Sequence, residues 1–120
     1  MTETEKTPIN KLRGEINVTL GDQDYVARLS MDAIIKLEER FDSSIIKMAT
    51  DLSSANIKMG VVIGIITIAI RGGGNDVNER SIKAKLYQIG LVEAYKIAGE
   101  ILTTCIGGES DSGNEEEAIE

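Results

Sequence analysis

The spacing of apolar residues changes from strand-like to helix-like about thirty residues into the chain. On both sides of Gly21, apolar side chains alternate with polar ones. The alternating residues are Ile16, Val18, Leu20, Tyr25, Ala27 and Leu29. A period of two is typical of half-buried strands, and glycine supplies the dihedral angles that a short turn needs. The pattern predicts a β-hairpin over residues 13–29.

Helical spacing begins after Ser30, a residue that caps helix N-termini well. Ile34, Leu37 and Phe41 share one face of a helix predicted over residues 31–41. A second short helix follows the break at residues 42–44 and ends near residue 53. Its apolar face carries Ile45, Met48, Ala49 and Leu52.

The most apolar segment, residues 56–71, allows two interpretations. Its many β-branched residues suit a strand, whereas its length and its stop at three glycines suit a buried helix. About 14 residues without a break exceed an ordinary strand, so we expect a helix. Asn75 and Asp76 then offer short side chains that cap the next helix.

The rest of the chain predicts two more helices and a polar tail. A basic helix over residues 76–86 has Arg80, Lys83 and Lys85 pointing outward, and a last helix runs from Leu91 to Cys105. The predicted fold class is α+β, mainly helical, with an N-terminal β-hairpin followed by four to five helices. We expect a flexible leader over residues 1–10, a single domain over residues 11–108 and a disordered tail over residues 109–120.

The net charge of −7 belongs mostly to that tail. Residues 109–120 carry no basic side chain and six acidic ones, namely Glu109, Asp111, Glu115, Glu116, Glu117 and Glu120. So few apolar residues cannot offset the entropy of ordering, which predicts disorder. The body is nearly neutral and aromatic residues make up only 3% of the chain, so we expect no nucleic-acid partner.

Composition also argues against catalysis. Histidine is absent, which removes the usual general base and the commonest nitrogen ligand of zinc. The lone Cys105 is interpreted as a core thiol in a reducing compartment. We therefore expect no enzyme activity, no cofactor and no metal site. The first residues lack the apolar stretch of a signal peptide and the apolar run is too short to cross a membrane, so the predicted location is the cytoplasm, and the resemblance given below implies that of a bacterial host.

Two motifs have a chemical and a structural interpretation. Gly72, Gly73 and Gly74 before a helix are able to hold phosphate, but the lysine of a P-loop is missing, which favours an interhelical turn. An acidic cluster in and just after the first helix is formed by Glu38, Glu39 and Asp42. It is more simply a solvated surface than a metal site.

A partner or oligomer interface is predicted on the first and third helices. Gly60 and Gly64 lie four residues apart, a spacing that lets another helix approach closely, either within one chain or between subunits. The third helix is apolar on both sides, which we expect one small domain to leave partly uncovered. The candidate interface residues are Ile34, Leu37, Phe41, Gly60, Ile63, Gly64 and Ile66.

Taken in order, these features resemble a family of phage-derived tail proteins found in bacterial gene transfer agents and related siphophages. The resemblance includes Arg13-Gly14-Glu15 before a strand, the hairpin, the segment 34–41 and the apolar helix. Its most specific part is the motif Arg71-Gly72-Gly73-Gly74-Asn75-Asp76-Val77. The acidic tail departs from the family pattern.

The family is described as a tail tube protein and as a tail assembly chaperone. Such a chaperone is small and helical and coats the tape measure protein until tube subunits replace it, whereas a tube subunit needs a larger β-sandwich. Two strands favour the chaperone. The resemblance implies the tape measure protein as partner, with the tail tube protein and a homo-oligomer as further expectations. The alternatives are a tube or adaptor component of the particle, and an enzyme or nucleotide-binding module, for which the sequence offers little beyond the glycine-rich turn.

Overall fold

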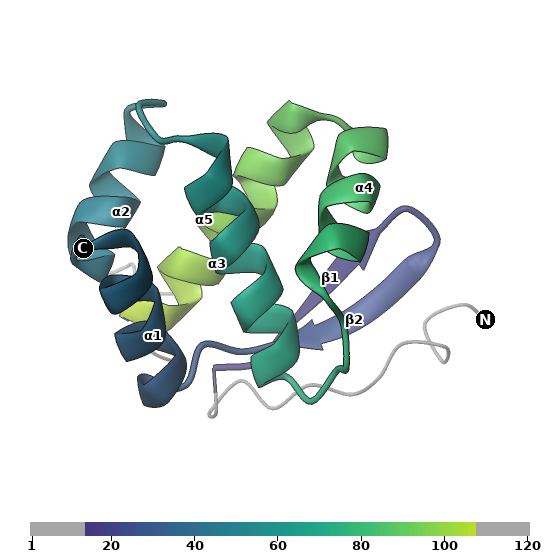
Figure 1. Ribbon diagram of the computed structural model, residues 1–120, viewed down its shortest axis with the longest axis horizontal. Coiled ribbons are helices and arrows are strands. Elements are labelled where there is room, and N and C mark those ends of the chain that lie inside the picture. Colours follow the sequence, from purple (N-terminus) through teal and green to yellow (C-terminus); the bar gives the residue numbers. More distant parts are fainter. Residues whose placement is uncertain (1–13, 108–120) are drawn as a thin grey trace, which may run out of the picture.

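The computed structural model describes residues 14–107, in which a two-stranded hairpin precedes five helices (Figure 1). Strand β1 (Ile16–Leu20) pairs antiparallel with β2 (Gln23–Ala27), and Leu20 lies opposite Gln23. The two-residue turn between them begins at Gly21, whose φ of 68° is left-handed. The predicted hairpin is confirmed, and both strands are shorter than the predicted range.

The first two helices begin at serine caps, as their sequences predict. In α1 (Met31–Phe41) the Ser30 hydroxyl accepts a hydrogen bond from the Ala33 amide at 3.2 Å. In α2 (Ile45–Ser53) the Ser44 hydroxyl accepts one from the Lys47 amide at 3.0 Å. Each serine satisfies a backbone donor that has no partner within its helix. The helix predicted over residues 31–41 is confirmed.

Helix α3 (Met59–Gly72) is the centre of the fold. It packs against α1, against β2 and against the later helices α4 (Glu79–Ile89) and α5 (Leu91–Gly107). Figure 1 shows α3 in teal between α1 and α4, with α5 crossing behind it. Its β-branched residues are helical because tertiary burial overrides their weak propensity. The buried residues of α3 are Val62, Ile63, Gly64, Ile65, Ile66, Thr67, Ala69 and Ile70.

Three expectations about the helices need correction. One chain covers most of both apolar sides of α3, where Met59, Val61 and Ile68 stay half-buried, so much less of this helix is uncovered than expected. Helix α4 begins at Glu79 and not at residue 76, because its N-cap is Asn78, whose Oδ1 accepts from the Ser81 amide at 2.8 Å. The last helix, α5, begins at Leu91 as expected but ends at Gly107, two residues beyond the predicted Cys105.

The fold class is confirmed: the described chain is α+β and mainly helical. The predicted leader and the predicted acidic tail lie outside the described residues, as do both ends of the predicted domain 11–108. Within residues 14–107, no helix has the length and hydropathy needed to cross a bilayer.

Candidate functional site

The glycine motif ends α3 and holds it against the hairpin. The Gly73 amide donates to the carbonyls of Ala69 and Ile70, both at 3.1 Å, and Gly74 turns the chain with a φ of 102°. The predicted helix stop at the three glycines is confirmed. Only the third of them uses the left-handed conformation that glycine permits.

Gly72 and Gly73 are needed for a different reason, which is close approach to a neighbouring backbone. A Cβ atom at Gly73 would overlap the carbonyl oxygen of Val26, and one at Gly72 would overlap that of Arg28. The Arg28 amide also donates to the Ala69 carbonyl at 2.8 Å. The end of α3 therefore lies directly on β2 and the residue after it, backbone against backbone, with no room for a side chain.

Asn75 links the same two elements. Its Nδ2 donates to the Val26 carbonyl at 2.8 Å and to the Ile70 carbonyl at 2.9 Å. The expectation that Asn75 and Asp76 cap the following helix is wrong, because Asn75 binds backward to α3 and β2 and Asn78 is the cap. The sequence did not reveal this contact, since the bond joins residues 49 positions apart.

The motif is completed by Arg71, which fixes the loop from α3 to α4. Its Nε donates to the Val77 carbonyl at 2.8 Å, and the Val77 side chain is half-buried against the core. Asp76 is exposed. Because the side chains of Arg71 and Asn75 already donate to backbone carbonyls of the loop, α3 and β2, the geometry favours an interhelical turn over a phosphate-binding site.

Replacing Asn75 by alanine should lower the free energy of unfolding by about 1–3 kcal/mol, because two partly buried carbonyls lose a donor. Urea denaturation followed by circular dichroism measures this. Asn56→Ala, at an exposed asparagine, is the matched control and should change stability little. Equal stability of both variants would mean that Asn75 does not hold α3 to the hairpin.

The structure distributes the candidate interface residues between the core and its edge. Leu37, Ile63, Gly64 and Ile66 are buried within one chain, and Ile34 and Phe41 are half-buried at the edge. Gly60 is exposed, and a Cβ there would meet no other atom within 4 Å. An interface through these residues stays a prediction, because the contacts described are those of a single chain.

Gly64 has a definite role inside the chain. A Cβ at this position would lie 2.6 Å from Cζ of Phe41, so the bare helix surface receives the phenyl ring of α1. The Arg40 guanidinium lies 4.7 Å from the centre of that ring. From there it donates to both carboxylate oxygens of Glu79 on α4, at 2.8 and 3.0 Å. Gly64, Phe41, Arg40 and Glu79 form a clasp that joins α1, α3 and α4.

The clasp also lowers the pKa of the Glu79 carboxyl. The hydrogen bonds from Arg40 are the largest cause that holds the pKa of the Glu79 carboxyl below its ordinary value; burial opposes them, and the charge of Arg40 adds a smaller lowering. A carboxyl whose folded-state pKa is depressed adds stability above its unfolded-state pKa, and that stability is lost as the pH falls through the folded-state value. The ion pair should therefore weaken in acid.

Glu79→Gln should cost about 0.5–1 kcal/mol at neutral pH, because the pair is partly exposed and screened by solvent. The difference between wild type and variant should begin to shrink as the pH falls below the ordinary glutamate pKa of about 4.3, and it should be lost as the pH passes through the lower folded-state pKa of Glu79. Urea titrations across this pH range test it. Glu39→Gln, at an exposed position of α1, is the control, and a difference that persists in acid would contradict the ion-pair account.

Little in the described residues resembles a reactive centre. Burial raises the pKa of the Cys105 thiol, which keeps it protonated and poorly nucleophilic. Among residues 14–107, no group of three possible metal ligands comes together. Glu38, one member of the acidic cluster, accepts a hydrogen bond from the Ile45 amide at 2.9 Å and so connects α1 to α2.

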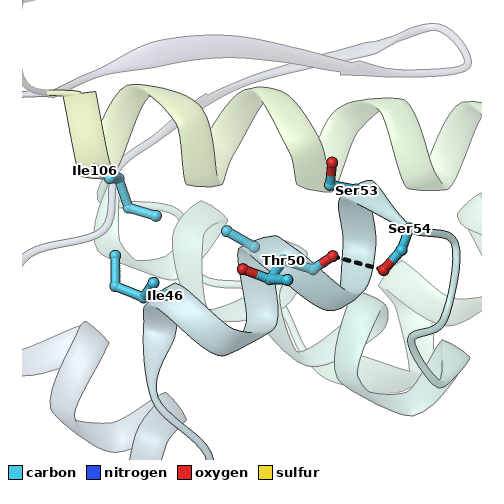
Figure 2. A pocket seen from close by; sticks show the side chains of 6 residues that line it. Ile46, Thr50, Ser53, Ser54 and Ile106 are labelled. Atoms are coloured by element: carbon cyan, nitrogen blue, oxygen red, sulfur yellow. Dashed lines mark hydrogen bonds between the residues drawn. The ribbon is translucent and has the colours of Figure 1, made fainter.

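A shallow apolar groove lies between α2 and the end of α5. Figure 2 shows Ile46 and Ile106 facing each other across it, with Thr50, Ser53 and Ser54 along one side. The Ser54 hydroxyl donates to the Thr50 carbonyl at 2.8 Å, which closes the last turn of α2. The groove is therefore lined by aliphatic side chains and by the hydroxyl groups at the end of α2. Such a lining suits packing against another apolar surface, and within the described residues none of these hydroxyls has a general base beside it.

The chain is thus a small helical scaffold. The polar side chains of its glycine motif bind other parts of the same chain and, in the part that the structure describes, form no reactive centre. Residues 13–108 match the family described as "Phage tail tube protein, GTA-gp10". The match covers most of the chain, and the protein belongs to this family of phage tail components. Comparisons with curated proteins and with solved structures gave no match. Membership implies that the chain interacts with other tail proteins.

Proposed function

We propose that this chain is a tail assembly chaperone that binds the tape measure protein while the tail is built. Family membership supports a role in the tail. The observation that carries the finer proposal is the small share of β structure: residues 14–107 contain two strands of five residues each and five helices. A tube subunit closes into rings through extended sheets, and this short hairpin offers little material for one.

We propose a partner interface with fewer residues than the sequence predicts, because several of the predicted residues are buried in the core. Ile34 and Phe41 at the edge of α1 are the candidate residues that a partner reaches without opening the core. Exposed Met31 and Ile35 extend the same helix surface. Contact with the buried Leu37, Ile63 or Ile66 would require α3 to lose its own neighbours. Self-association through the same edge remains part of the proposal.

The proposed role is non-enzymatic and located in the cytoplasm of the bacterial host. The alternative is a structural tail component, either tube or adaptor, and the family's description as a tail tube protein supports it. The two functions differ in the fate of the protein. A chaperone leaves before the particle is complete, whereas a structural component stays.

Two measurements test the proposal. Co-expression with a tape measure protein from the same genome, followed by affinity capture of the tagged chain, should retain the tape measure protein. Mass spectrometry of purified particles should then find the tape measure protein without this chain. Stoichiometric recovery of the chain from finished particles would refute the chaperone role and favour the structural one.

A further inference from the structure

Helix α4 carries an exposed surface that the fold itself does not use. Arg80, Lys83, Ala84 and Tyr87 are all exposed, and their spacing of three and four residues places them in one row along the helix. The buried Ile82 and Leu86 lie on the opposite side of α4 and face the core. We call the exposed row, with Leu91 and Val92 beyond its end, the α4 surface.

The two ends of the α4 surface differ in chemistry. The first half is positive: among residues 14–107, the described ion pairs include neither Arg80 nor Lys83. Glu79, the acid of this helix, is bound by Arg40 and feels the charge of Lys83 more weakly. The second half is apolar, with Tyr87 82%, Leu91 53% and Val92 75% exposed. These three exposed side chains fall within residues 87–92, and exposed large apolar side chains that cluster typically mark an interaction site.

We propose that the α4 surface docks an acidic amphipathic helix of the partner, a proposal that rests on the tape-measure-binding function above. We choose this partner because its chemistry complements both ends of the α4 surface. Arg80 and Lys83 attract carboxylates, and Tyr87 at the other end packs best against apolar side chains. From Arg80 to Tyr87 the row measures about 10 Å at the rise of an α-helix. A helix lying along α4 offers side chains at the matching spacing of three and four residues.

The chemistry argues against a nucleic acid in this position. Two positive charges make few phosphate contacts, and the single aromatic ring gives one stacking position where single strands use several. Leu91 and Val92 would gain nothing from a phosphate backbone. The partner is therefore assigned as a protein helix whose apolar stripe is flanked by Asp or Glu.

The test compares charge reversal on and off the α4 surface. The affinity of the tagged chain for the tape measure protein from the same genome is measured for three proteins. These are wild type, the double variant Arg80→Glu with Lys83→Glu, and Tyr87→Ala. Reversal should weaken binding at least about tenfold and remove most of its salt dependence. Tyr87→Ala should weaken it about tenfold. Lys47→Glu with Lys58→Glu, which reverses two exposed lysines outside both the α4 surface and the edge of α1, should bind as wild type does.

A photo-crosslinking residue at position 87 identifies the occupant, with position 46 on α2 as the control. Crosslinking from position 87 to an acidic amphipathic segment of the tape measure protein supports the proposal. If wild type binds and the charge-reversed variant binds equally, the α4 surface is not the docking site and the chaperone function stands. If wild type does not bind, both proposals fail. Crosslinking to a second copy or to nucleic acid would assign the surface to that occupant instead.

Discussion

Replacing Gly73 by alanine should destabilise this protein severely, by about 3 kcal/mol or more, because the new methyl group would overlap the Val26 carbonyl. The obstacle is backbone, which cannot move aside as the end of a flexible side chain can. Gly73 has an ordinary φ of −83°, so the cost does not come from its conformation. The expected result is loss of the folded state in urea at concentrations that wild type withstands.

Gly60→Ala is the matched control for this variant, since a Cβ there meets nothing within 4 Å and alanine suits a helix better. It should leave stability unchanged or raise it slightly. If Gly73→Ala were as stable as Gly60→Ala, the close approach of α3 to the hairpin would not be a property of the folded protein in solution.

Gly64→Leu should lower the free energy of unfolding by about 1–3 kcal/mol through overpacking against Phe41. Because the obstructing ring belongs to the same chain, the melting temperature should fall equally at all protein concentrations. Calorimetry at several concentrations measures this, and Gly60→Leu on the open side of the same helix is the control. Adding Phe41→Ala to Gly64→Leu should restore part of the loss, since the leucine then has room.

A different outcome would relocate the contact. Loss of an oligomer in sedimentation, with helical circular dichroism retained, would show that Gly64 lies between subunits as well as under Phe41. That result would support the interface predicted from the spacing of Gly60 and Gly64. A variant as stable as wild type would contradict the packing of Phe41 on α3.

Local rules predicted the elements well because each rests on a few neighbouring residues. The alternation around Gly21 specified the hairpin, and Ser30 marked the start of α1. The start of α4 was misplaced because two asparagines compete in the loop before it, and only the fold shows that Asn75 is engaged elsewhere. Capping propensity gives both residues the same chance.

The site was harder to predict because its determinants are distant contacts. The sequence predicts the helix stop at the glycines, yet the reason for Gly72 and Gly73 is the backbone of β2 and of the residue after it, some 45 positions earlier. The two apolar sides of α3 suggest a partner, whereas four elements of its own chain cover most of them. Hydrophobic periodicity reports that a side is buried and does not say what covers it.

The contacts around Val26 also affect whether a strand of another chain can add to the edge of β2. A strand at the margin of a sheet ordinarily offers unpaired amides and carbonyls to which a foreign strand adds. Along β2 the outward carbonyl of Val26 is already bound by Asn75, and the amide of the following Arg28 by Ala69. These contacts occupy two of the groups that a foreign strand would use at this edge, and Asn75→Ala, which frees the Val26 carbonyl, should make the hairpin more prone to strand addition and aggregation.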